Sequence, residues 1–239
     1  MYEAVRADPA GESTAARFAA AASEHGYDGV VVRNSRDDVV PPTFDSRAAY
    51  AEAIEAEYGA DAVWGVELGG DRGTLTRAVR ESREDVTILC VAGGGADRNR
   101  FAVETPAVDV LTRPMTERGD FNHVLARAAA ENGVRVEFDF GPVLRASGGE
   151  RVQALRDLRK LREILFYYDA PYVCSVCADS HLHLRAPRDL AALGEQIGFT
   201  GEQVREGFRE WGRLVERNRE RFDDSFIAPG VRKGRGDVR

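Results

Sequence analysis

The sequence predicts an α/β barrel in which seven parallel strands are wrapped by helices. Short runs rich in β-branched residues alternate with helical patterns along the whole chain. The strand runs are continuously apolar, as in the GVVV segment at 29–32, which is typical of strands buried on both faces. No dinucleotide-binding glycine fingerprint follows the first strand, and this favours a closed or nearly closed, TIM-like barrel over an open sheet.

The elements follow one another in a regular order. In the first half we expect strands at 2–5, 28–33, 62–68 and 86–91. Between them we expect a helix capped by Ser13, a helix over 46–58 and a helix over 75–82.

The second half continues the alternation. We expect strands at 108–111, 134–140 and 172–176, and helices at 98–104, at 121–131 and at 151–168, the second of them ended by Asn132-Gly133. An Arg-Pro turn after the last strand leads into a further helix, and an amphipathic helix over 202–222 completes the pattern. No linker interrupts the chain, so we expect one domain over 1–225 and a basic, disordered tail over 226–239.

Composition points to an ordinary globular protein of the cytoplasm. The apolar fraction is 43%, no apolar run approaches the ~18 residues of a membrane helix, and the N-terminus lacks the order of a signal peptide. Three cysteines are too few for a disulfide scaffold and fit a reducing compartment.

The basic residues are almost all arginine. Of 33 basic residues only Lys160 and Lys233 are lysine, and the net charge is −7, a balance that indicates adaptation to high salt. At molar salt the Debye length falls to about 3 Å, so an acidic protein can still bind a polyanion through local, bidentate arginine contacts.

Polar residues cluster where strands end, and in a barrel this rim carries function. The expected rim residues are Arg6, Asp8, Arg33, Asn34, Glu67, Arg113, Asp139, Ser175, Asp179 and His181. His181-x-His183 beside Asp179 resembles a metal site. A protein metal site needs three or four ligands, however, and the other histidines lie in helical segments, so a polar loop is favoured over a metal site. Cys174-x-x-Cys177 lacks a second pair, so we expect two buried structural thiols.

Two further motifs leave alternatives open. Gly93-Gly94-Gly95 lies between a strand and a helix, so it is either a phosphate cradle or a tight turn. Arg156, Arg159 and Lys160 share a helix face that either grips RNA phosphates or is simply solvated, since Glu163 lies in the same stripe.

Several segments together resemble the archaeal ribonuclease P protein component 3 family, the archaeal counterpart of the Rpp30 subunit. The segments that carry the resemblance span nearly the whole domain: YEAV at 2–5, GVVVRN at 29–34, AGGGADRNRFAVETPAVDVLTRP at 92–114, VRVEFDF at 134–140 and VCADSHLHLRAPRDLAALGEQIGF at 174–199.

The resemblance implies a barrel of the polymerase and histidinol phosphatase (PHP) type that serves as an RNA-binding protein subunit of ribonuclease P. The RNA of that endoribonuclease removes the 5′ leader from precursor tRNA with RNA-bound Mg²⁺, so no cofactor, metal or catalytic residue is expected in the protein. The implied partners are the ribonuclease P RNA, a Pop5-type subunit in a heterodimer or heterotetramer, the other ribonuclease P proteins and precursor tRNA, without a membrane.

The chain departs from a PHP phosphoesterase at the first strand. Such an enzyme needs an HxH motif there, and Arg6-Ala7-Asp8 stands in its place. The rival hypothesis, a free-standing metal-dependent phosphoesterase using His181, His183, Asp179 and Glu67, therefore lacks two ligands, and a third option is an RNA-independent scaffold. The residues expected to contact RNA are Arg6, Arg33, Arg98, Arg113, Arg156, Arg159, Lys160, Arg185 and Arg188.

Overall fold

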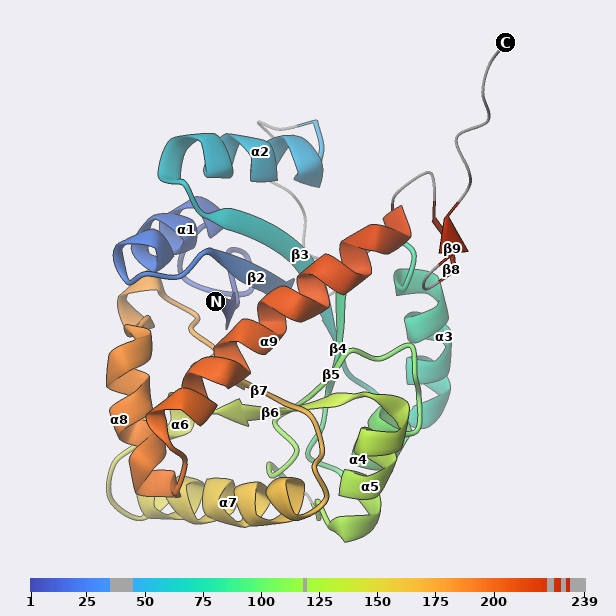
Figure 1. Ribbon diagram of the computed structural model, residues 1–239, viewed down its shortest axis with the longest axis vertical. Helices are drawn as coiled ribbons and strands as arrows, with labels where there is room; N and C mark the ends of the chain where they lie inside the picture. Colours follow the sequence, from blue (N-terminus) through green and yellow to red (C-terminus); the bar gives the residue numbers. More distant parts are fainter. Residues whose placement is uncertain (35–44, 118–119, 223–225, 229–230, 233–239) are drawn as a thin grey trace.

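The structure, a computed structural model, describes residues 1–34, 45–117, 120–222, 226–228 and 231–232. Seven parallel strands stand in sequential order around a barrel (Figure 1), which confirms the predicted fold class. They are β1 (Tyr2–Val5), β2 (Gly29–Asn34), β3 (Asp61–Leu68), β4 (Ile88–Ala92), β5 (Val110–Thr112), β6 (Arg135–Asp139) and β7 (Tyr172–Ser175).

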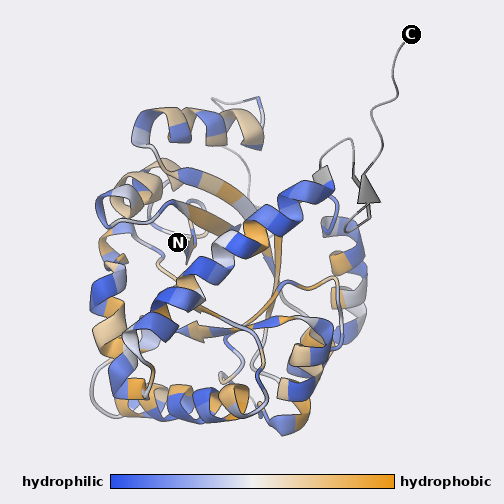
Figure 2. Cartoon of the chain, in the orientation of Figure 1, coloured by the Kyte–Doolittle hydropathy of each residue, from blue (hydrophilic) through white to orange (hydrophobic). Residues whose placement is uncertain are grey.

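Helices surround the strands. These are α1 (Ala15–Glu24), α2 (Arg47–Tyr58), α3 (Arg72–Ser82), α4 (Ala96–Val103), α5 (His123–Asn132), α6 (Gly141–Arg145), α7 (Gly148–Tyr167) and α8 (Pro187–Ile197). In Figure 2 the strands are mostly hydrophobic, whereas the helices show alternating hydrophilic and hydrophobic bands. The larger core therefore lies between the outer surface of the barrel and the inner faces of the helices, where Leu89, Val136 and Phe138 are completely buried.

The seam between β1 and β7 is closed by few main-chain contacts. A single parallel bridge joins Val5 to Ala178, with Arg6 N donating to Ala178 O at 2.8 Å. Further down the seam, the carboxylate of Glu3 accepts the N–H of Val176 at 3.0 Å. A side chain thus takes the place of a ladder hydrogen bond, and its burial raises the pKa of Glu3 to about 8 although the Val176 N–H favours the charged form.

Helix α9 (Gly201–Arg219) crosses the barrel at the N-terminal ends of the strands, which we call the floor (Figure 1). Its residues Trp211, Leu214 and Val215 belong to a second buried cluster, together with side chains that point from the strands into the barrel. Those strand residues are Ala4, Val31, Val63, Ile88, Cys90, Val110 and Val173. The Trp211 indole N–H donates to the carbonyl of Cys174 at 3.0 Å, so this large ring is both buried and satisfied.

Polar contacts tie α9 to the first residues of several strands. Arg219 pairs with Asp61 at 2.7 Å, Glu210 pairs with Arg135 at 2.7 Å, and Asn218 donates to Thr87 O at 2.9 Å. Arg217 pairs with Asp109 at 2.6 Å. Because these contacts cover the floor, the opposite end of the barrel is left for a site. We call that C-terminal end the mouth.

Two sequence-based expectations need correction. Ser13 was expected to cap the first helix, but Thr14 is its N-cap, because Ser13 is buried and bonds to His181 instead. Within the tail predicted to be disordered over 226–239, the short strands β8 (Phe226–Ala228) and β9 (Val231–Arg232) pair antiparallel. The other residues of that tail lie outside the described residues.

In the part of the chain that the structure describes, no helix is long and apolar enough to cross a membrane.

Replacing Glu3 by Gln tests the seam. A carboxyl whose pKa rises on folding, from the ordinary 4.5 to about 8, binds more protons in the folded than in the unfolded state. Its contribution to stability is therefore full below pH 4.5 and is lost as the pH rises to about 8. We expect the free energy of unfolding of the wild type to fall across this range by up to about 1.4 kcal/mol per pH unit relative to Glu3→Gln, in denaturant titrations at constant salt. Parallel pH profiles for the two proteins would contradict this assignment.

The contact between α9 and β7 depends on Gly207. A Cβ there would lie 2.4 Å from Cys174 Sγ and 3.0 Å from the Cys174 Cβ. We expect Gly207→Ala to lower the free energy of unfolding by about 1–3 kcal/mol, because this close contact cannot relax without shifting α9. Gly149→Ala in α7 is the matched control, since its added Cβ meets nothing within 4 Å, and it should leave stability unchanged or slightly improved.

Candidate functional site

Five charged side chains meet at the mouth, and we call them the mouth cluster. They are Arg33 from β2, Glu67 from β3, Glu137 from β6, and Arg6 and Arg113 from the residues that follow β1 and β5. Side chains alternate across a strand, so Arg33 and Glu67 stand two and four positions beyond the inward-facing Val31 and Val63 of the floor. On β6 the residue two positions before Glu137 is Arg135, which pairs with Glu210 of α9. The barrel interior therefore changes from apolar at the floor to ionic at the mouth.

Arg33 lies at the centre of the cluster. Its side chain is 0% exposed, and its Nη1 lies 2.8 Å from Glu137 Oε1 and 3.6 Å from Glu67 Oε1. None of its three nitrogens makes a hydrogen bond of good geometry. The guanidinium is therefore held by charge attraction inside the barrel rather than by directed hydrogen bonds.

Of the two carboxylates in the mouth cluster, Glu67 has the larger number of partners. Arg6 Nη2 and Arg113 Nη2 donate to its Oε2 at 2.6 and 2.8 Å, and the Thr112 hydroxyl donates to its Oε1 at 2.6 Å. Burial by itself would raise the pKa of Glu67, but the guanidinium groups of Arg33, Arg113 and Arg6 outweigh it and lower the pKa to about 2. A carboxylate bound in this way is a structural counter-ion and is a poor proton acceptor.

The carboxylates of β6 differ from Glu67. Glu137 Oε1 accepts the Ser175 hydroxyl at 2.5 Å, whereas its Oε2 is buried without a hydrogen-bond partner. Asp139, nearer the opening, accepts the N–H of Gly141 at 2.8 Å. Burial of its carboxyl and the adjacent Glu137 charge raise the pKa of Asp139 to about 6.

Arg113 turns back into the mouth because of its backbone. Its φ of 47° lies in the left-handed region, which is uncommon for a residue with a side chain. The ion pair with Glu67 stabilises this conformation at the end of β5.

The histidine motif lies in a short polar turn. His181–His183 is a turn of 3-10 helix rather than an extended segment, so with three residues per turn the two imidazoles diverge. His181 Nδ1 lies 2.8 Å from Ser13 Oγ, and His183 Nδ1 lies 2.7 Å from Asp179 Oδ1. Among the described residues no three His, Cys, Asp or Glu side chains gather in a way that could hold a metal ion, so the ligand set of the rival phosphoesterase is not assembled.

The cysteines are structural, as predicted. Cys174 and Cys177 are free thiols inside the protein, and burial raises the pKa of Cys177 to about 11.

Gly93 and Gly94 of the glycine loop form a tight turn in which their amides bond to the protein itself. Gly93 N donates to Thr112 O at 2.8 Å and Gly94 N donates to Asn99 Oδ1 at 3.0 Å, so both amides are already used. A Cβ at Gly93 would lie 2.4 Å from Asn99 Oδ1, which explains the need for glycine.

The arginines expected to contact RNA fall into separate groups. Arg33 is enclosed in the barrel, and this burial contradicts its prediction as an RNA contact. Arg6 and Arg113 are 28% and 33% exposed but are engaged with Glu67. Arg98, in α4, pairs at 2.6 Å with Glu117 of the loop that follows β5.

The remaining predicted basic residues are exposed on α7 and around the start of α8. Arg156 and Lys160 lie one turn apart on α7, and Arg159 reaches across to the carbonyl of Gln196, at 2.7 Å, near the end of α8. Arg188 is 85% exposed, and Arg185 bonds to the Leu182 and Leu184 carbonyls. Of the predicted RNA contacts, these five are the most exposed and therefore the most accessible to a large anionic partner.

The sequence did not predict that the mouth carboxylates would include Glu137 or be bound by the hydroxyls of Thr112 and Ser175; it placed Ser175 only at the rim. The available signal is the pattern VEFDF at 136–140, in which acidic residues alternate with large apolar ones and therefore point into the barrel.

The chain was also compared with known proteins. The family model described as RNase P subunit p30 matches residues 1–223. Proteins named Ribonuclease P protein component 3 are similar along their whole length: that of Halorubrum lacusprofundi is 56% identical over 98% of this chain and 98% of its own, and that of Haloarcula marismortui is 54% identical over 97% and 96%. The Methanosarcina acetivorans relative is 32% identical over 84% of this chain and 82% of its own.

Solved structures share the fold. A chain in the cryo-EM structure of archaeal ribonuclease P with mature tRNA superposes with a TM-score of 0.81 at 23% identity, covering 100% of this chain and 98% of that one. The A. niger ochratoxinase structure gives a TM-score of 0.55 at 11% identity, with 87% and 69% covered. At these identities the likeness concerns the barrel architecture.

The mouth cluster predicts a large cost for removing its central anion. Glu67→Gln leaves three guanidinium groups facing one another, and we expect the free energy of unfolding to fall by about 3–5 kcal/mol. Because the pKa of Glu67 is lowered on folding, its contribution is present above the ordinary 4.5 and is lost as the pH falls to about 2. The difference between the wild type and the variant, measured by denaturant titration, should therefore shrink in acid. Glu202→Gln, at an exposed ion pair on α9, is the control and should leave stability nearly unchanged.

Proposed function

Since this chain belongs to the RNase P subunit p30 family and is thus a protein subunit of ribonuclease P, we propose that it binds the catalytic RNA and supports removal of the 5′ leader from precursor tRNA. The observation that carries the proposal is the match of the family model to residues 1–223, together with 56% identity to a relative over 98% of the chain. In this role the protein positions the RNA and screens its charge.

The exposed basic residues of α7 and of the start of α8 supply a suitable surface. Arg156, Lys160 and Arg188 project from helices that a rigid barrel holds in place. Guanidinium groups bind phosphate by two parallel hydrogen bonds, which keeps such contacts useful at high salt. These contacts would fix the orientation of the RNA without reading its sequence.

The mouth cluster supports a non-catalytic role for the polypeptide. Glu67 is neutralised by three arginines, so it is unsuited to activate water or to bind a metal ion. We assign the cleavage chemistry to the RNA and place the Mg²⁺ ions on it.

The proposed assembly includes a Pop5-type protein subunit, as a heterodimer or heterotetramer with this chain, and the other ribonuclease P proteins. Precursor tRNA is the substrate of the whole assembly. We propose that the assembly works in the cytoplasm.

Charge reversal on α7 tests the RNA surface. We expect Arg156→Glu with Lys160→Glu to weaken binding of transcribed ribonuclease P RNA by about tenfold or more and to reduce the slope of log K against log salt by about 2, since each lost phosphate contact removes about one. Binding is measured over a series of KCl concentrations. Arg113 is unsuitable for such a test, because its reversal would place a second carboxylate against Glu67.

The matched control is Arg72→Glu with Arg80→Glu on α3, which lies across the barrel from α8 (Figure 1). It changes the net charge by the same amount and should preserve the salt slope. Equal slopes for the α7 variant and the wild type would remove α7 from the RNA-binding surface.

A further inference from the structure

A pocket of about 340 Å³ opens at the mouth, over the end of β6 and between the loop that follows β5 and helix α7. We call it the mouth pocket. Its lining residues come from three places along the chain, and they are Arg113 to Thr116, Glu137, Asp139 and Pro142, and Glu150, Gln153, Ala154, Asp157, Leu158 and Leu161. This volume is at the lower end of those that hold small ligands, so the pocket suits one or two long side chains.

The walls of the mouth pocket are apolar and its charges are mostly negative. Pro114, Met115, Leu158 and Leu161 form apolar walls. Four carboxylates and one guanidinium complete the lining: Glu137, Asp139, Glu150, Asp157 and Arg113. Arg113 is bound to Glu67 and Glu137 is paired with Arg33. Asp139, Glu150 and Asp157 therefore give the mouth pocket a surplus of negative charge.

One oxygen of the deepest carboxylate lacks a hydrogen-bond donor. Glu137 is 0% exposed; its Oε1 interacts with Ser175 and Arg33, while its Oε2 makes no hydrogen bond. A buried carboxylate oxygen without a donor is costly, by an amount that a donor entering the pocket would recover. The mouth pocket therefore offers an incoming cation a specific hydrogen-bond acceptor as well as a negative field.

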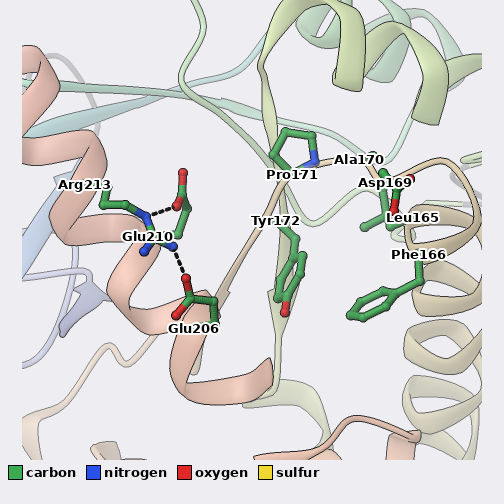
Figure 3. Close-up of a pocket in the computed structure, with 9 residues that line it drawn as sticks. All are labelled: Leu165, Phe166, Asp169, Ala170, Pro171, Tyr172, Glu206, Glu210 and Arg213. Carbon is green, nitrogen blue, oxygen red and sulfur yellow. Dashed lines mark hydrogen bonds and ion pairs between the residues drawn. The ribbon is translucent and has the colours of Figure 1, made fainter. Parts of the chain in front are cut away.

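A pocket at the opposite end of the barrel provides a contrast. It measures about 310 Å³ and is lined by Phe166 and Tyr172 on one side and by acidic residues of α9 on the other (Figure 3). There Glu206 and Glu210 are both bound by Arg213 at 2.5 Å. Among the described residues, no buried polar side-chain atom of this pocket lacks a hydrogen bond, so the pocket offers an incoming group no unpaired donor or acceptor.

The chemistry of the mouth pocket selects its occupant. RNA phosphates are excluded by the surplus of carboxylates, and the described residues provide no cluster suited to a metal ion. Arginine and lysine side chains combine an apolar stem, which matches the walls, with a cationic donor head that can reach Glu137 and Asp139. We propose that the mouth pocket receives an arginine or lysine side chain from a protein partner within ribonuclease P, an inference that rests on the proposed function.

Two variants of the full chain test this inference. Asp139→Asn with Glu150→Gln removes two charges while keeping side-chain shape, and the amide oxygen introduced by Asp139→Asn can still accept the Gly141 N–H. Ala154→Arg places a guanidinium of the chain itself in the pocket. We expect each variant to lower the affinity for one of the other ribonuclease P proteins, with the Pop5-type subunit tested first, by about tenfold or more. Binding of the isolated ribonuclease P RNA should be unchanged or stronger.

The matched control for the double variant is Glu52→Gln with Glu84→Gln, at exposed positions away from the pocket. It should leave both affinities unchanged, and thermal unfolding verifies that all variants are folded. Wild-type affinity of both pocket variants for every protein subunit would overturn the inference while leaving the proposed function intact. Loss of RNA binding alone would also overturn it, by making the pocket an RNA site. Failure of the wild-type chain to bind either RNA or proteins would instead refute the proposed function, and the inference with it.

Discussion

The arrangement of the mouth depends on one buried positive charge. Arg33 is fully enclosed, and a guanidinium removed from water needs anions close by. Glu67 and Glu137 supply them, and these carboxylates in turn bind Arg6, Arg113, Thr112 and Ser175. The network links six strands or their ends, and a one-residue slip of β2 would place the guanidinium in the apolar layer outside the barrel. The charge therefore specifies the register as well as the chemistry of the mouth.

This constraint also separates the surfaces of the molecule. The floor is covered by α9 and the mouth is filled by paired charges, so the barrel interior serves as a rigid support. The exposed cations expected to contact RNA lie on α7 and around the start of α8, whereas four carboxylates line the mouth pocket. A protein built in this way can present a positive face to RNA and a negative pocket to a basic protein partner without the two competing.

The near absence of lysine acquires a structural meaning at both ends of the barrel. At the floor, Arg83 donates to the carbonyls of Ala107, Val86 and Thr87 and to the carboxylate of Asp109, a set of directions that a planar guanidinium can satisfy. At the mouth, two guanidinium groups share one oxygen of Glu67. An ammonium group, which is compact and more strongly hydrated, fits neither place well.

The sequence by itself determined the barrel, because apolar strand runs and amphipathic helices are local patterns that survive in any register. It also indicated the mouth residues Arg6, Arg33, Glu67 and Arg113, since residues at strand ends must lie at the rim. Only the tertiary structure decided which of them are accessible. Arg33 points into the barrel because side chains alternate along a strand, and the carboxylates that pair with it come from β3 and β6, which are distant from it in sequence. The same holds for the Ser13 contact with His181, 168 residues away, because such pairings depend on barrel closure and leave no local pattern.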